Sequence, residues 1–133
     1  MYKTAILGDN VSVGMFSEIG PDVVIGDWTR IGNGCFIPEG VRIGRNCFLG
    51  PKVCIVHDLF MHTPPFEPDV KEEWNSVVIE DGARIGANAL IRPGVVIHRD
   101  AIVGMGSVVT KDVGEGEIWA GNPAKKIRDI KEE

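Results

Sequence analysis

His57 and Asp58 are adjacent, and this pair is the first candidate for acid–base chemistry in the sequence. An imidazole changes its protonation state near neutral pH, which suits it to accept a proton during a reaction. A neighbouring carboxylate can orient the ring or stabilise its charged form. The sequence therefore predicts that His57 is a general base supported by Asp58. The alternative interpretation is a histidine that is hydrogen-bonded in a loop corner.

Basic residues gather in the last part of the chain, at Lys111, Lys125, Lys126 and Arg128. The whole chain carries a formal net charge of −5, so an anionic ligand would need local cations of this kind. The same net charge argues against a general nucleic-acid binder. The alternative interpretation of the four cations is a solvated face.

Aliphatic residues recur at every sixth position. This register defines the elements that must position His57, Asp58 and the basic residues. A helix repeats every 3.6 residues and a simple strand every two, so neither period fits. Of the 17 glycines, 14 lie either directly after an aliphatic of the series or three places after it. The spacing predicts a parallel β-helix, in which each hexad supplies a short strand and a corner.

This register resembles that of the hexapeptide-repeat acyltransferases, an all-β family whose fold is a left-handed parallel β-helix with three hexads per coil. The resemblance covers about residues 1–128 and implies one domain of about five coils over 1–133. It also implies that equivalent aliphatics stack on three faces. The predicted stacks are Leu7, Ile25, Ile43, Ile79 and Ile97; Val13, Ile31, Leu49, Ile85 and Val103; and Ile19, Ile37, Ile55, Ile91 and Val109.

The register is interrupted between Ile55 and Ile79, where 24 residues replace the expected six. The 18 extra residues predict a loop over about 57–76, with three prolines that oppose strand pairing and large apolar side chains that would be costly on a monomer's surface. In the resembled family this loop folds over a neighbouring subunit. The resemblance therefore implies a homotrimer with active sites between subunits, and the alternative is a loop packed on its own coil.

The chain leaves the register after Val113, and we expect a tail over about 114–133. Asn122 suits the cap of a helix, and Pro123 suits its first position. The sequence therefore predicts a short C-terminal helix over about 123–131, packed beside the last coil.

Two segments, VGMGSVVTKDV at 103–113 and AGNPAK at 120–125, resemble the signature of coenzyme-A-dependent members of the family. The resemblance implies that acetyl-CoA is the co-substrate and that its pantetheine arm lies parallel to the coil axis. It places the arm beside Ala87 and Met105, the adenosine end beside Thr110 and Lys111, and the phosphates near Lys125 and Arg128. Met105 stands where the family commonly has alanine.

The segment IVHDLF at 55–60 resembles the FTND segment of the branch that acetylates amino groups on nucleotide-linked sugars. His57 replaces the asparagine of that segment, and Asp58 matches its aspartate. The resemblance implies direct attack of a sugar amine on the thioester. A backbone N–H should stabilise the resulting oxyanion, and Gly94, on the same face one coil later, is the candidate. The alternative is one more corner glycine.

Other functions stay open. A sugar O-acetyltransferase would use the same fold and signature, and a non-catalytic protein could retain the fold alone. The spacing of His57 and His62 is similar to that of zinc ligands in the gamma carbonic anhydrases, which share this fold, but His98 lies two faces away, so we expect no metal. The three cysteines lack zinc spacing, and no signal peptide or membrane span is recognisable, so we expect a reduced, cytoplasmic protein with no membrane partner.

Overall fold

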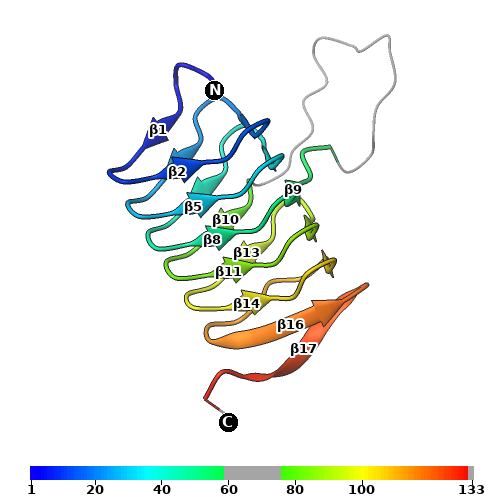
Figure 1. The fold of residues 1–133 in the computed structure, drawn as a ribbon. Coiled ribbons are helices and arrows are strands. Elements are labelled where there is room, and N and C mark those ends of the chain that lie inside the picture. The colour runs from blue at the N-terminus through cyan, green and yellow to red at the C-terminus, as the bar shows by residue number, and fades with distance from the viewer. Residues whose placement is uncertain (59–75, 132–133) are drawn as a thin grey trace, which may run out of the picture.

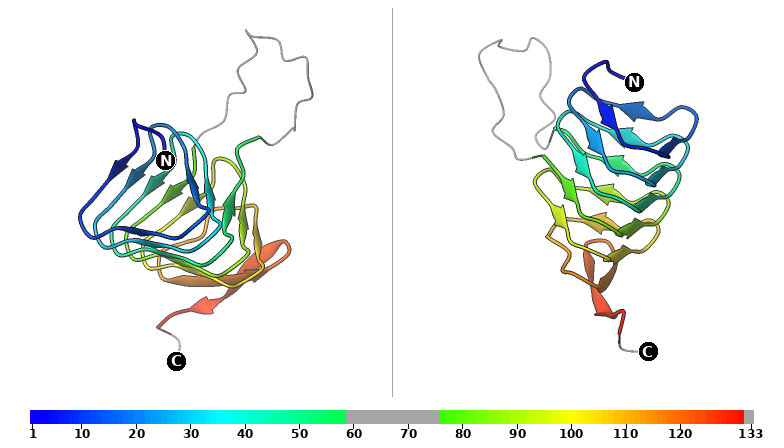
Figure 2. Two further views of the ribbon diagram at one scale, coloured as in Figure 1. Left: turned by 45° about the horizontal axis from the view of Figure 1, so that its top comes forward. Right: turned by 90° about the vertical axis from the view of Figure 1, so that its left-hand side faces the viewer.

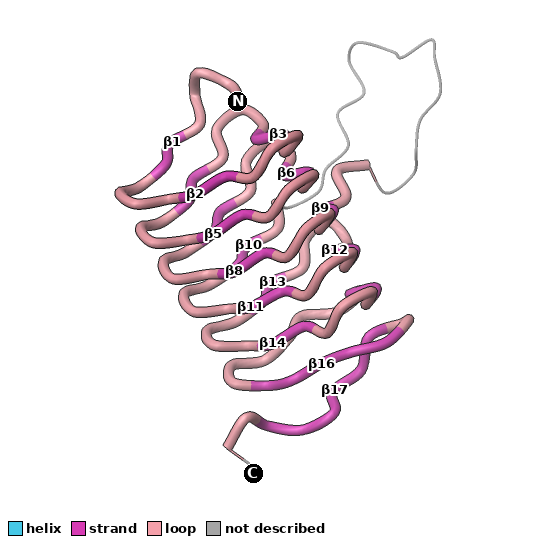
Figure 3. Tube along the Cα trace, viewed as in Figure 1, coloured by secondary structure: helices cyan, strands magenta, loops and turns pink. Residues whose placement is uncertain are grey.

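The computed structural model describes residues 1–58 and 76–131, and within these ranges the chain forms short strands and no helix (Figure 3). Two-residue strands follow one another around three parallel sheets, which we call sheets A, B and C. Sheet A consists of β1 (Ile6–Leu7), β4 (Val24–Ile25), β7 (Arg42–Ile43), β10 (Val78–Ile79) and β13 (Val96–Ile97). Sheet C consists of β3 (Glu18–Ile19), β6 (Phe36–Ile37), β9 (Cys54–Ile55), β12 (Leu90–Ile91) and β15 (Val108–Val109).

Sheet B has seven strands because a hairpin extends it at the C-terminal end. Its strands are β2 (Ser12–Val13), β5 (Arg30–Ile31), β8 (Phe48–Leu49), β11 (Arg84–Ile85), β14 (Ile102–Val103), β16 (Glu117–Gly121) and β17 (Ala124–Asp129). In Figure 1 the front strands β2, β5, β8, β11 and β14 point to the right while the chain descends from the N-terminus. The coil is therefore left-handed, against the general preference of parallel crossovers for the right hand. The predicted fold class is confirmed.

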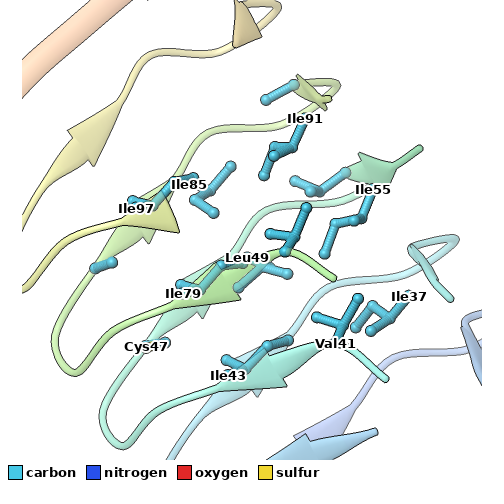
Figure 4. Close-up of a cluster of buried hydrophobic side chains, with 14 of the residues drawn as sticks. Ile37, Val41, Ile43, Cys47, Leu49, Ile55, Ile79, Ile85, Ile91 and Ile97 are labelled. Carbon is cyan, nitrogen blue, oxygen red and sulfur yellow. The ribbon is translucent and has the colours of Figure 1, made fainter. Parts of the chain in front are cut away.

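The three aliphatic stacks form the core, and the predicted pairing register is confirmed. Ile25 is the partner of Leu7 and of Ile43 in sheet A, and Leu49 is the partner of Ile31 and Ile85 in sheet B. These side chains point into the coil (Figure 4), where almost all are inaccessible to water. Burying one such side chain stabilises a fold by about 1.5–3 kcal/mol, so the stacks supply most of the driving force for folding.

The glycines lie at the corners between sheets, where the chain needs them for two reasons. Three places after the inward aliphatic, the chain takes a left-handed backbone, as at Gly40 with φ 77° and Gly82 with φ 75°. Directly after the inward aliphatic, successive coils touch: a Cβ on Gly50 would lie 2.6 Å from the backbone nitrogen of Ala87. The glycine excess is thus a consequence of a tightly stacked lattice.

The predicted interruption after Ile55 is visible in the pairing. Ile43 pairs with Ile79 although 36 residues separate them, twice the separation of Ile25 and Ile43. Sheet C is nevertheless continuous at this point, because Ile55 of β9 pairs with Ile91 of β12. The interruption therefore falls after β9 of sheet C and before β10 of sheet A, at what we call the C/A corner (Figure 2). Most of the predicted loop, residues 59–75, lies outside the described residues.

The expected C-terminal helix is wrong. β16 pairs in parallel with β14, and β17 returns antiparallel to β16, so the tail is a β-hairpin whose turn contains Asn122 and Pro123. The reason is the free edge of β14, whose backbone groups need partners once the regular coils end. The hairpin covers that edge at the C-terminal end of the coil (Figure 1). No helix in the described ranges is long and apolar enough to cross a membrane.

Candidate active site

His57 and Asp58 lie at the C/A corner, one residue beyond the end of β9, and they are the last described residues before the interruption. The N–H of Val56 donates to the carbonyl of Ile91 at 2.8 Å, which ties the residue before His57 to the next coil. Both side chains are half-buried. The pair therefore stands on an anchored strand end, as a positioned general base requires.

Gly94 lies at the same corner, in the coil that follows His57. Other corner glycines donate their N–H to a carbonyl of the preceding coil, at 3.0 Å from Gly40 to Pro21 and at 2.8 Å from Gly106 to Ala87. By position the partner of Gly94 would be the carbonyl of His57, but the chain departs from the coil there. No hydrogen bond joins the Gly94 N–H to the described part of the chain, and the residue is exposed. Its left-handed backbone, φ 81°, thus presents an available donor.

A groove of about 340 Å³ runs over the outside of sheet C beside this corner. The described residues that line it are mostly apolar: Val56, Leu90, Arg92, Pro93, Val108, Val109 and Thr110. The outward side chains of β12 and β15 form part of it, and Leu90 is 41% exposed. The groove can therefore take a weakly polar segment of a ligand, and Val56 and Pro93 of its lining directly precede His57 and Gly94 in the chain.

Sequence reasoning missed this groove, although a signal was present. Outward positions on sheet C carry Cys54, Leu90 and Val108 in three successive coils, where a solvated face would carry polar side chains. Thr110, predicted from the signature, does line the groove, and Lys111 follows it at the C/A corner. Arg92 was not singled out in the sequence.

Ala87 and Met105 occupy the opposite flank of sheet C, at the B/C corner. They lie one coil apart, as predicted. The N–H of Gly106, the residue after Met105, donates to the carbonyl of Ala87 and shows that the two corners are stacked. Met105 is 83% exposed, so its side chain points away from the core and can contact a ligand or a neighbouring chain. The two flanks of sheet C thus hold Ala87 and Met105 on one side and Thr110 and Lys111 on the other.

The basic residues of the tail are divided by the hairpin. Lys125 pairs with Ala120 close to the turn, at the B/C corner, and makes no ion pair with any described residue. Arg128 pairs with Ile118, three residues and about 10 Å further from the turn. The structure therefore brings Lys125 to the end of sheet C and leaves Arg128 over sheet B.

Lys126 is held in an internal cluster. Its Nζ lies 3.0 Å from Glu117 Oε2 and 3.0 Å from Asp129 Oδ1. Hydrogen bonds from Lys126 and from Trp119 lower the pKa of Glu117, and those carboxylates raise the pKa of Lys126. This cation is therefore compensated within the hairpin, so a ligand phosphate finds it less available than Lys125.

The remaining candidates are structural. Cys35 and Cys47 are buried, and burial raises the pKa of both thiols, so neither is a ready nucleophile. His98 lies at the A/B corner, with Nδ1 2.9 Å from Glu80 Oε1. Within the described ranges no three metal-ligating side chains come together, and His62 lies outside those ranges.

Comparisons with known proteins match this architecture. The model of the bacterial transferase hexapeptide (six repeats) matches residues 4–39 and 76–111, and that of the hexapeptide repeat of succinyl-transferase matches residues 40–56. A search of curated protein sequences found no significant match.

Several solved structures share the fold. A maltose O-acetyltransferase from Clostridium difficile 630 is 26% identical, with a TM-score of 0.79 over 98% of this chain and 72% of that chain. A hexapeptide-repeat acetyltransferase from Vibrio cholerae, complexed with acetyl-CoA, is 27% identical, with a TM-score of 0.70 over 93% of this chain and 73% of that chain. A perosamine N-acetyltransferase from Caulobacter crescentus, with CoA and GDP-perosamine, is 27% identical, with a TM-score of 0.69 over 97% of this chain and 56% of that chain.

These findings confirm the predicted family and the acetyltransferase class, and the relatives with bound acetyl-CoA or CoA support the predicted co-substrate. The repeat matches cover more than half of the chain, on the same coils that carry the groove and the Gly94 corner. The chain belongs to the hexapeptide-repeat transferases.

Proposed function

We propose that this protein transfers the acetyl group of acetyl-CoA to the amino group of a nucleotide-linked amino sugar. The observation that carries the proposal is the available N–H of Gly94, one coil from His57 and Asp58 and beside an apolar groove. Acyl transfer uses a base that takes the proton of the nucleophile and a backbone donor that stabilises the developing oxyanion.

In this proposal the pantetheine arm lies along sheet C, with its thioester at the C/A corner. The amine nitrogen attacks the thioester carbon, and the Gly94 N–H donates to the developing oxyanion. His57 accepts the proton that the nitrogen loses, and Asp58 supports the charged ring. When the tetrahedral intermediate collapses, the carbon–sulfur bond breaks and the sulfur takes the proton that His57 holds, which leaves an amide, free CoA and neutral His57.

The cofactor's anionic end is then expected at the C-terminal end of sheet C. Lys111 and Lys125 lie on its two flanks there, with Thr110 between the groove and Lys111. Ala87 and Met105 are proposed to contact the pantetheine arm. Arg128, further along the hairpin, is the more distant of the proposed phosphate contacts.

We also propose that the 1–133 chain is one domain that works as a homotrimer, with each groove closed by a neighbouring subunit. Among the described residues, Leu90, which lines the groove, and Met105, at the B/C corner, are both exposed. Exposed apolar side chains of this kind are a natural place for a second subunit to cover.

A second candidate is sugar O-acetylation, because a maltose O-acetyltransferase has a high structural similarity to this chain. The same base and donor would serve a hydroxyl nucleophile. The test is a panel of nucleotide-linked amino sugars and matched hydroxy sugars incubated with acetyl-CoA and analysed by mass spectrometry. N-acetylated nucleotide sugar supports the proposal. Acetylation of hydroxyl acceptors alone would replace it with the second candidate.

A further inference from the structure

We propose that the outward face of sheet B binds a nucleotide, with Phe48 stacking on the base and Arg30 and Arg84 binding the phosphates. The three side chains occupy the same outward position on β5, β8 and β11, which lie side by side at the front of Figure 1. Phe48 is the register partner of Arg30 on one side and of Arg84 on the other. Neighbouring strands lie about 4.8 Å apart, so the face presents an aromatic ring between two guanidinium groups.

The chemistry of these three side chains fits the two halves of a nucleotide. Arg30 and Arg84 are exposed, and Phe48 is 44% exposed. An aromatic ring offers a stacking surface to any base, and a guanidinium group forms paired hydrogen bonds with a phosphate. A base stacked on Phe48 would leave its 5′ phosphates within reach of Arg30 or Arg84, one strand away on either side.

The charge of the surrounding surface favours an anionic ligand. None of the 19 acidic residues of the chain lies in the sector that comprises sheet B and the B/C corner, which spans residues 12–17, 30–35, 48–53, 84–89 and 102–107. This sector has a formal charge of +3, from two arginines and a lysine. In the described coils, the equivalent sectors that begin at the strands of sheets A and C contain five acidic residues each. In a chain of net charge −5, an anion therefore approaches the sheet B sector most easily.

A second aromatic residue lies beside Arg30. Trp28 is two residues before Arg30, at the A/B corner, and it is 62% exposed. Its backbone is left-handed, φ 64°, which is unfavourable for a bulky residue; Asn46 and Gly82 stand at the same position in the next two coils. A costly conformation of an exposed residue adds nothing to the core, so it points to a role in binding. We therefore include Trp28 in the proposed site.

A nucleotide at this face can belong either to the acceptor or to CoA, whose adenosine end carries a diphosphate. Sheet B lies between the A/B and B/C corners, opposite the C/A corner that carries His57 and Gly94. A nucleotide-linked sugar bound here would therefore meet the C/A corner of a neighbouring subunit, in line with the proposed homotrimer. CoA is the other source, because Ala87 of the B/C corner is a proposed contact of its pantetheine arm. The inference concerns nucleotide binding itself, so it does not rest on which acceptor is acetylated.

The experiment measures equilibrium binding of UDP, ADP, uridine, inorganic pyrophosphate and CoA to the full chain by isothermal titration calorimetry. The variants are Phe48→Leu, which keeps an apolar side chain without the ring, Phe48→Tyr, which keeps the ring, and the double variant Arg30→Ala/Arg84→Ala. Arg42→Ala is the matched control, because Arg42 is an exposed arginine at the outward position of sheet A. Thermal melting checks the fold of each variant.

We expect Phe48→Leu to weaken the binding of UDP or ADP by about 5- to 100-fold, as for loss of one base stack, and Phe48→Tyr to preserve it. The double arginine variant should weaken the same nucleotides by at least about tenfold, less so at high salt, and should leave uridine unchanged. Arg42→Ala should bind like the wild type. UDP that binds equally well to CoA-saturated protein identifies the acceptor as the source. CoA that displaces both nucleotides, and that Phe48→Leu weakens in the same way, identifies the cofactor.

Three results would overturn the inference: no binding of either nucleotide at millimolar concentration, affinities that Phe48→Leu leaves unchanged, or an equal loss for Arg42→Ala. Pyrophosphate that binds as tightly as UDP would also refute it, because the base would then contribute nothing. A change of oligomeric state in Phe48→Leu, measured by light scattering, with an unaltered nucleotide affinity would assign sheet B to a subunit contact instead. If no amine is acetylated, the proposed function fails separately, and these binding results still decide the inference.

Discussion

Replacing Gly94 by alanine should slow acetyl transfer far more than it destabilises the fold. Gly94 has a left-handed backbone, φ 81°, in which a Cβ is disfavoured by about 1–2 kcal/mol. The variant can relieve this strain by rotating the peptide, which turns the N–H away from the reaction centre. Gly116 provides the matched control, because it also has a left-handed backbone, φ 66°, but its N–H donates to Arg99 at the A/B corner.

The two variants should lose similar stability and very different activity. An alanine Cβ at Gly116 meets no atom within 4 Å, so its cost is backbone strain alone, a decrease of a few degrees in Tm. Loss of one oxyanion donor lowers kcat by about 100- to 1,000-fold. The KM of acetyl-CoA should change little, because the contact strengthens only in the transition state.

The assay is steady-state kinetics on Gly94→Ala and Gly116→Ala, with Tm measured for both by thermal melting. The reasoning predicts a low kcat for Gly94→Ala alone, at a similar Tm. Equal kcat values for the two variants would refute the role of the Gly94 N–H. A fall in kcat matched by a large fall in Tm only at Gly94 would point instead to local unfolding of the corner.

Three further predictions concern the base, the cofactor and the hairpin. His57→Asn should lower kcat by about 100- to 10,000-fold with an unchanged KM for acetyl-CoA, and undiminished turnover would remove His57 as the base. Lys125→Ala should raise the KM of acetyl-CoA by about fivefold at low salt and less at high salt, whereas Lys131→Ala should not; a salt-independent effect would argue against a phosphate contact. Glu117→Gln should lower Tm at pH 7, and the difference from wild type should shrink as the pH falls below 4.5, the ordinary pKa of glutamic acid, because the lowered pKa of Glu117 stabilises the fold only while the group is ionised. A Tm difference that persists in acid would show that the Lys126 ion pair is not its source.

Most of the fold could be predicted because the aliphatic register carries it. Each inward side chain, such as Ile25 or Leu49, must stack on its equivalent one coil away, and an 18-residue insertion leaves that register unchanged on either side. The tail could not be predicted in this way. Asn122 and Pro123 suit the start of a helix and the turn of a hairpin equally, and the free edge of β14 decides between them.

The site was predictable only in part, for a related reason. The register places Gly94 one coil after His57, but whether its N–H has a hydrogen-bond partner depends on where the chain leaves the coil. The linear sequence does not show that Lys125 and Arg128 lie at different distances from sheet C, because that difference arises from their places along a β-hairpin strand. Arg92 stands beside a groove that forms only when Leu90 and Val108 line up in successive coils.

The most direct test of the proposed site is a crystal structure of the protein with acetyl-CoA or CoA bound together with an acceptor. With acetyl-CoA bound, the proposal predicts that the thioester carbonyl oxygen lies within about 3–3.5 Å of the Gly94 nitrogen. With CoA bound, it predicts that the CoA sulfur lies within about 3–3.5 Å of the acceptor amine. In both complexes His57 should contact that amine. It also predicts the adenosine end beside Lys111 and Lys125. CoA bound instead in the groove of about 460 Å³ that Arg42, Glu80 and Arg99 line beside sheet A would contradict the proposed site.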